Sequence, residues 1–191
     1  SMGSYITLDS IQSGNPIKNI ILSGSSVPDG SILIFQNLFL KLSNLLKGKE
    51  NYSRTMHELV FGGFNKSIEN SRTPSDWLSY SVNSVDDYIA DPLCGFVVSN
   101  LLWSDLLVGF KRIFDKNRFY LYQSDLSVLI LSGKEDAAGG FSAGPKKLHK
   151  ILSSKTSNCT LKLYDGMRHE ILNEPSRNIV YDDVLHYLVN K

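Results

Sequence analysis

Residues Ser127–Asp136 read S-V-L-I-L-S-G-K-E-D, and this stretch decides the fold class of the chain. Val128–Ser132 is an apolar run with β-branched residues that stops at Gly133, which is typical of a short buried strand. Asp136 follows on the loop after that glycine. In open parallel sheets the reactive side chains lie just beyond the carboxyl ends of the strands, so Asp136 is a candidate for chemistry.

Two further segments have the same character as this strand. Thr160–Tyr164 leads into a loop that carries His169, and Ile17–Ser23 ends at Gly24. Because the carboxyl ends of parallel strands meet at one edge of a sheet, we expect Asp136 and His169 to lie close together. An acid after one strand and a histidine after the next form the acid–base half of a hydrolytic triad.

Length and composition indicate one globular domain. The chain has 191 residues, of which 42% are hydrophobic and 20% charged, and its net charge of +1 argues against nucleic-acid binding through phosphate neutralisation. We expect Cys94 and Cys159 to be reduced thiols, with a disulfide as the alternative. The sequence has no apolar span long enough to cross a membrane and no signal-peptide pattern. A cytoplasmic location is therefore expected, with peripheral membrane contact left open.

The pattern changes between residues 25 and 124. Buried strands give way to amphipathic, aromatic-rich helical segments, and Ile32–Leu46 carries an apolar surface too broad for a helix packed on one side. A connection of this length is far longer than a normal crossover between two strands. We therefore expect an α/β core, residues 1–24 and 125–191, with an inserted helical cap, residues 25–124. A separate helical domain is the alternative.

Other helical patterns complete the expected architecture. They lie at Tyr5–Gln12, Asn51–Phe61, Trp77-Leu78, Val85–Ile89, Leu101–Phe114, Gly144–Ser153 and Asn178–Val189. The last of them places Val180, Val184, Tyr187 and Leu188 on one stripe. A helix that leads into a buried parallel strand is the second half of a βαβ unit, but no strand precedes Tyr5–Gln12 in this sequence. The N-terminal half of the sheet is expected in the same protein or in a separate chain.

Ser1 is the candidate nucleophile. The order Ser1, Asp136, His169 is the chain order of nucleophile, acid and histidine in α/β-hydrolases. Ser1-Met2-Gly3-Ser4 is similar to the latter part of a G-x-S-x-G elbow, in which the serine lies on a strained turn between a strand and a helix. A cloning remnant is the alternative for Ser1-Met2.

With these motifs the sequence resembles the serine-hydrolase family that holds lysophospholipases, monoacylglycerol lipases and S33 serine-aminopeptidase-like relatives with a helical cap. The matching segments run in order through nearly the whole chain: Ser1-Met2-Gly3-Ser4, Ile21-Leu22-Ser23-Gly24, Thr73-Pro74, Asp76-Trp77-Leu78, Asp91–Phe96, Leu131-Ser132-Gly133 with Asp136, and Arg168-His169-Glu170 with Asn173-Glu174. One departure is Ala137-Ala138, where the family more often has a proline and an aliphatic residue.

The resemblance implies an α/β-hydrolase fold, here the C-terminal part of a mainly parallel sheet, and hydrolysis of monoacyl lipid esters through an acyl-enzyme. Ser1 would be the nucleophile, His169 the general base and acid, and Asp136 the group that orients the imidazole. The backbone N–H of Met2 would supply half of the oxyanion hole. The resemblance implies no metal and no cofactor, and a small-molecule lipid ester as the substrate.

Two other functions remain open at this stage. A proline-iminopeptidase-like peptidase needs acidic groups that hold a free amine, and the candidates in the cap are Glu58, Glu69, Asp86 and Asp87. A non-catalytic binding module would follow from the missing half of the sheet, which leaves the edge of Ile17–Ser23 unpaired.

Several residues are expected to have structural roles. Asp165 lies in a turn directly after its strand, and Glu174 and Arg177 are interpreted as a local pair without a catalytic role. His169-Glu170 lacks the second histidine of a zinc-protease helix, so a metal site is not expected there. The cap aromatic residues are expected mostly in its core, with some along an acyl-chain cleft: Phe35, Phe39, Phe61, Phe64, Trp77, Phe96, Trp103 and Phe110.

Overall fold

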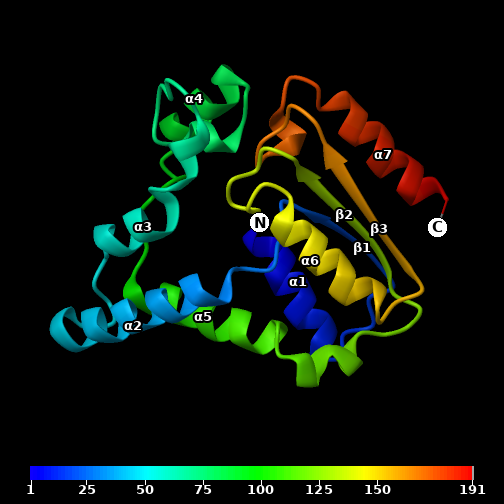
Figure 1. Ribbon diagram of the computed structural model, residues 1–191, viewed down its shortest axis with the longest axis horizontal. Coiled ribbons are helices and arrows are strands. Elements are labelled where there is room, and N and C mark those ends of the chain that lie inside the picture. Colours follow the sequence, from blue (N-terminus) through cyan, green and yellow to red (C-terminus); the bar gives the residue numbers. More distant parts are fainter. Residues whose placement is uncertain (191) are drawn as a thin grey trace.

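The computed structural model describes residues 1–190 and contains a parallel sheet with the strand order β1-β2-β3. β1 (Asn19–Ser23) and β3 (Asn158–Tyr164) both pair with the central strand, β2 (Ser127–Gly133) (Figure 1). The three strands predicted from the sequence are confirmed. β1 begins at Asn19 rather than at Ile17, because the N–H of Ile17 donates to Asn15 O (2.8 Å) in a turn.

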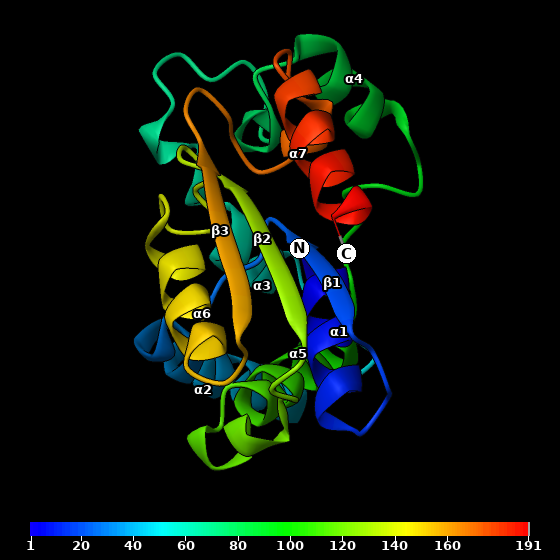
Figure 2. The same cartoon turned by 90° about the vertical axis from the view of Figure 1, so that its right-hand side faces the viewer.

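Helices cover both faces of the sheet (Figures 1 and 2). α1 (Met2–Gln12) and α6 (Ala143–Ser153) share one hydrophobic cluster with the sheet, and α7 (Asn178–Val189) covers the opposite face. Of the stripe predicted on α7, Val180 and Tyr187 are buried and Val184 packs against them. The prediction was wrong for Leu188, which is 56% exposed.

The central strand explains the apolar run in the sequence. Every residue of β2 is buried. Val128 and Ile130 belong to the cluster with α1 and α6, whereas Leu129 and Leu131 belong to the cluster with α7. Successive side chains of a strand point to opposite faces, so a strand that is covered twice must be apolar at nearly every position.

Between β1 and β2 the chain leaves the sheet and forms a series of helices (Figure 1). We refer to residues 25–124 as the helical insertion. Its longer helices are α2 (Gly30–Lys47), α3 (Arg54–Phe61), α4 (Val82–Ala90) and α5 (Asn100–Ile113), and its 3₁₀ helices are η1 (Phe64–Ser67), η2 (Asp76–Leu78) and η3 (Lys116–Leu121). The expected helices are confirmed, with shifted ends.

Side-chain caps set where these helices begin. Ser53 Oγ accepts the N–H of Met56 (3.1 Å), so α3 starts at Arg54 and not at Asn51. Ser81 caps α4 in the same way, which starts that helix three residues before Val85. α1 begins at Met2 rather than at Tyr5.

The end of the insertion packs on the α/β part of the chain. The ring of Tyr5 in α1 makes edge contacts with Phe110 (4.6 Å between centroids) and Phe114 (6.2 Å). Gln12 Nε2 donates to the carbonyl oxygen of Ile113 (2.9 Å), and Ile113 and Tyr122 belong to the cluster beneath α1 and α6. The last residues of the insertion are therefore part of the main core.

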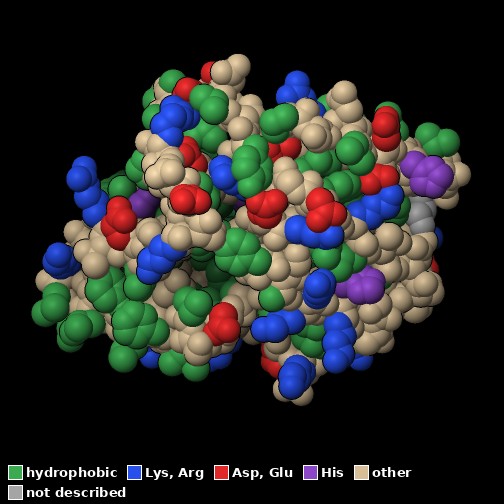
Figure 3. Space-filling view, turned by 45° about the horizontal axis from the view of Figure 1, so that its top comes forward, with side chains coloured by type: hydrophobic (Ala, Val, Ile, Leu, Met, Phe, Trp, Pro, Cys, Tyr) green, Lys and Arg blue, Asp and Glu red, His purple; other side chains and the backbone are tan. Residues whose placement is uncertain are grey.

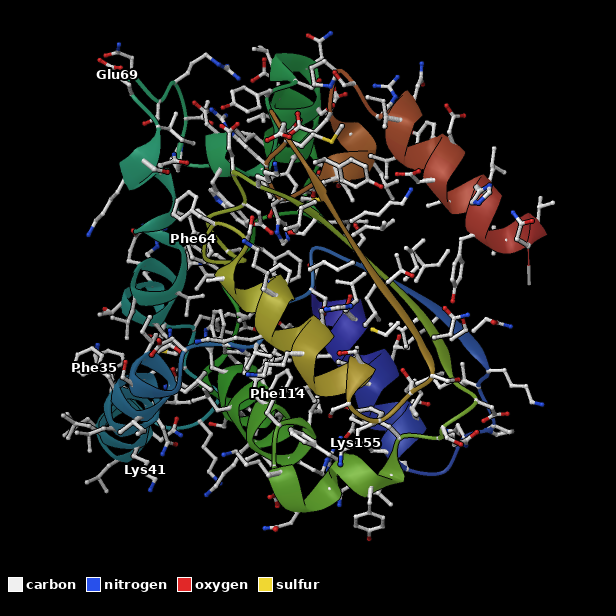
Figure 4. The ribbon with its side chains drawn as sticks, turned by 45° about the vertical axis from the view of Figure 1, so that its right-hand side comes forward. Phe35, Lys41, Phe64, Glu69, Phe114 and Lys155 are labelled. Atoms are coloured by element: carbon white, nitrogen blue, oxygen red, sulfur yellow. The ribbon has the colours of Figure 1, made fainter. Side chains whose placement is uncertain are left out.

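The helix α2 leaves a large apolar surface exposed. Figure 3 shows apolar side chains gathered at this end of the molecule, and Figure 4 shows Phe35 and Lys41 at its outer edge. The exposed apolar residues of α2 are Ile32, Ile34, Phe35, Leu38, Leu42, Leu45 and Leu46. Within residues 1–190, no helix combines the length and the hydrophobicity that a membrane span requires.

Candidate active site

The carboxyl ends of β2 and β3 bring Asp136 and His169 together. His169 Nδ1 lies 3.0 Å from Asp136 Oδ2; the aspartate side chain is fully buried and that of the histidine is 11% exposed. A carboxylate oxygen only accepts hydrogen bonds, so Nδ1 carries the proton and Nε2 is left to accept one from another group. The pair expected from the sequence is hydrogen-bonded in the structure.

Gly133 permits this approach of the two loops. A Cβ at this position would lie 2.2 Å from the carbonyl oxygens of both Met167 and Arg168. The loops are also joined through their backbones, because Glu135 N donates to Met167 O (3.0 Å). The glycine that ends β2 is thus required by the close packing of the histidine loop.

The segment after Asp136 wraps around its carboxyl group. A Cβ on Gly139 would lie 3.0 Å from Asp136 Oδ2, and Phe141 N donates to the carbonyl oxygen of Asp136 (2.9 Å). Phe141 and Ser142 both adopt left-handed backbone angles, with φ of 53° and 75°. Asp136 Oδ1 accepts no hydrogen bond from residues 1–190. This tight loop holds the carboxyl group toward His169.

Ser1 lies beside the same site, on the other side of Gly24. The Ser1 nitrogen is 2.7 Å from Gly24 O, and a Cβ on Gly24 would lie 3.0 Å from His169 Cε1. Ser1 is the N-cap of α1, so the N–H of Met2 lies in the first helical turn, where amides lack partners within the helix. Within the described chain no hydrogen bond joins Ser1 Oγ to His169. The structure places the third expected residue next to the pair without closing that contact.

Four residues around this site were not identified as site residues from the sequence: Trp77, Tyr80, Arg168 and Glu174. The ring of Trp77 lies 5.2 Å from the ring of His169, and the guanidinium of Arg168 lies 3.8 Å from the centre of the Tyr80 ring. Glu174 is fully buried, and its carboxylate accepts the backbone N–H groups of Arg168 and Tyr80. Trp77, Arg168 and Glu174 belong to segments quoted for the resemblance, but no local pattern indicated which residues they contact.

Residues 1–176 match the sequence profile of a family described as "Serine aminopeptidase, S33". The chain belongs to this family. No curated protein sequence matches it.

Solved structures similar to this S33 family member identify its fold as an α/β-hydrolase. A thermostable carboxyl esterase from Bacillus coagulans in complex with glycerol is 21% identical with a TM-score of 0.88, over 99% of this chain and 62% of that one. A lipase in an open form is 23% identical with a TM-score of 0.86, over 100% of this chain and 63% of that one. A monoacylglycerol lipase from Paleococcus ferrophilus is 18% identical with a TM-score of 0.66, over 100% and 66%. The chain thus spans less than two thirds of the length of these structures.

Two other predictions for this family member concern acidic residues near the site. Asp165 is 84% exposed and pairs with Lys134 (2.7 Å), as expected of a structural turn residue. The local pair of Glu174 with Arg177 was wrong: the contact is Arg177 N donating to the Glu174 carbonyl oxygen (3.1 Å), and the carboxylate points into the protein. A buried carboxylate finds donors nearby, whereas Arg177 lies at the surface.

The remaining candidates do not assemble into a second site. The acids considered for a free amine, Glu58, Glu69, Asp86 and Asp87, are all exposed, and Figure 4 shows Glu69 at an outer tip of the insertion. Cys94 and Cys159 are free, and burial raises the pKa of Cys159 to about 11. Residues 1–190 contain no cluster of three or more His, Cys, Asp or Glu side chains that could hold a metal ion.

Proposed function

We propose that this chain carries the nucleophile, acid and histidine of a serine carboxylester hydrolase that acts on monoacyl lipid esters. The observation that carries the proposal is the hydrogen bond between His169 Nδ1 and the buried Asp136. With Nδ1 engaged, Nε2 is the nitrogen that can accept a proton. Gly24 lies next to both the His169 ring and Ser1. Membership of the S33 family supports the same chemistry.

In the proposed reaction, the Ser1 hydroxyl gives its proton to His169 Nε2 while Oγ attacks the ester carbonyl. The tetrahedral intermediate collapses when the protonated histidine donates to the leaving alcohol, and an acyl-enzyme remains. Water then attacks with the same histidine as base and releases the acid. Asp136 holds the Nδ1 proton throughout, and the N–H of Met2 donates to the oxyanion.

The lipid substrate is supported by the surface of the helical insertion. The exposed apolar face of α2 offers contact with an acyl chain or with a lipid phase that contains the substrate. One similar structure is a monoacylglycerol lipase by its description. We therefore propose that residues 25–124 act as a cap over the site and that the protein makes peripheral contact with lipid.

The proposal is tested by comparing p-nitrophenyl octanoate with an aminoacyl p-nitroanilide on the complete gene product. We expect kcat/KM to be at least about 100-fold higher for the ester, because the acids considered for a free amine, Glu58, Glu69, Asp86 and Asp87, are all exposed. Higher activity on the anilide would favour the peptidase. No turnover of either compound would favour a binding module.

The control for this assay compares alanine variants of two serines at the start of α1. Ser1→Ala is expected to abolish ester hydrolysis. Ser4→Ala is expected to keep activity within about twofold, since the one hydrogen bond of Ser4 Oγ within residues 1–190 goes to the Ser23 carbonyl oxygen (3.3 Å). If Ser4→Ala abolished activity and Ser1→Ala did not, the assignment of the nucleophile would be wrong.

A further inference from the structure

Glu174 is a fully buried carboxylate that the proposed reaction does not use. Its Oε1 accepts the backbone N–H of Arg168 (2.6 Å), and its Oε2 accepts the hydroxyl of Ser79 (2.9 Å) and the backbone N–H of Tyr80 (2.8 Å). Two of these donors come from the helical insertion and one from the histidine loop. The carboxylate therefore bridges two segments that are far apart in the sequence.

The same two segments are joined on the other side of the histidine. The N–H of Glu170 donates to the carbonyl oxygen of Leu78 (2.7 Å). The backbone N–H groups directly before and after His169 are thus both held, one by the carboxylate of Glu174 and one by the insertion. The side chain of Arg168 also joins the histidine loop to the insertion, since its guanidinium donates to Asp76 O (2.7 Å) and Ser79 O (3.2 Å).

The segment that Glu174 binds, Ser79–Tyr80, closely follows along the chain a residue that contacts the imidazole of His169. Trp77 contacts the ring of His169 at 5.2 Å between centroids, with the planes inclined by 48°. Trp77 also contacts the rings of Phe61 (5.9 Å between centroids) and Phe64 (4.9 Å). The imidazole is thus in contact with both the Asp136 carboxyl and the Trp77 ring.

We infer that Glu174 is a positioning residue, whose carboxylate fastens Ser79–Tyr80 to the histidine loop and so fixes the imidazole of His169 in contact with Asp136 and Trp77. The inference rests on the proposed function, because it is the orientation of the proposed catalytic base that Glu174 controls. A carboxylate is required because both oxygens face donors. A glutamine in its place would set an NH₂ group against an N–H or O–H.

The test separates positioning from stability by measuring catalysis per active site. Active sites are counted from the burst of p-nitrophenol released by a p-nitrophenyl ester, and the acylation rate constant is measured in the same experiment. Glu174→Gln is expected to lower the acylation rate constant per titrated site about 10- to 100-fold, since a displaced base misses its near-attack geometry. The substrate dissociation constant, obtained from the concentration dependence of the burst rate, is expected to change much less.

The matched control is a structural carboxylate elsewhere in the fold. Asp183 in α7 accepts hydrogen bonds from Lys162 Nζ and Tyr164 Oη, which are side chains of β3 and not of the histidine loop. Asp183→Asn is expected to lower the melting temperature but to leave the acylation rate constant per titrated site within about twofold. The two variants thus separate loss of stability from loss of alignment.

Ser79→Ala is the second variant, which keeps the test decisive if Glu174→Gln does not fold. It removes one donor to the same carboxylate, so we expect a loss of about 3- to 10-fold in the acylation rate constant. In the double variant the loss in the acylation rate constant should be smaller than the product of the two single losses, because both substitutions act through one contact. An unchanged rate constant per titrated site in Ser79→Ala, or in a folded Glu174→Gln, would overturn the inference. Absence of any p-nitrophenol release by the wild-type protein, as a burst or as steady turnover, would instead overturn the proposed function.

Discussion

Asp136→Asn is expected to lower kcat for ester hydrolysis about 10⁴-fold. The Asp136 carboxylate accepts the proton of His169 Nδ1, and an amide can offer its NH₂ group to that nitrogen instead. The imidazole then takes the other tautomer, with its proton on Nε2, where it cannot accept the serine proton. The measurement is kcat on p-nitrophenyl octanoate, with a thermal melt to show that the variant is folded.

Asp165→Asn is the matched control for this variant. Asp165 also follows a strand of the sheet, but it is exposed and pairs with Lys134. Exposed ion pairs contribute little, so activity within about twofold of the wild type is expected. If Asp136→Asn kept more than about a tenth of kcat, Asp136 would not be the acid that orients the histidine.

Gly133→Ala is expected to lower the free energy of unfolding by about 3 kcal/mol. The added Cβ would stand 2.2 Å from the carbonyl oxygens of Met167 and Arg168, and both are backbone atoms that cannot rotate away. The end of β2 must therefore separate from the histidine loop, with loss of the hydrogen bond from Glu135 N to Met167 O. Urea denaturation followed by circular dichroism measures the change.

Gly109→Ala in α5 makes the same chemical change where there is room for it. No atom lies within 4 Å of a Cβ built there, and alanine is the better helix former by about 0.5–1 kcal/mol. This variant is expected to be neutral or slightly more stable. Equal stability of Gly133→Ala and the wild type would show that the two loops are not packed as described.

The parts of the fold that follow from local pattern could be predicted from the sequence. The strands are short apolar runs that stop at glycine or a turn, and their parallel pairing brings Asp136 and His169 to one edge. Membership of the S33 family agrees with the resemblance carried by these motifs. Helix ends were displaced where a serine cap, such as Ser53, set the start.

The contacts around the histidine loop could not be predicted in the same way. Ser79 and Glu174 are separated by 95 positions, and neither lies in a periodic pattern that points to the other. Glu174 and Arg177 carry opposite charges three positions apart, which suggested a local pair, but burial of the carboxylate selected donors from another segment. Tertiary packing therefore decided the role of Glu174.

The sequence indicates correctly that α2 has a broad apolar surface, but not that much of this surface is exposed. The sequence favoured packing of Ile32–Leu46 on more than one side, whereas Phe35 and Leu42 of this helix are exposed by 58% and 55%. Hydrophobic pattern shows which residues avoid water but does not say whether protein or another apolar phase covers them.

The central claim is that Ser1, His169 and Asp136 act as one unit, and mapping of a fluorophosphonate adduct tests it most directly. The complete gene product is treated with the probe, digested and analysed by mass spectrometry, beside the His169→Ala and Ser4→Ala variants. The account predicts an adduct on Ser1 in the wild type and in Ser4→Ala, and none in His169→Ala. An adduct on another residue, no adduct in the wild type, or undiminished labelling of Ser1 in His169→Ala would contradict it.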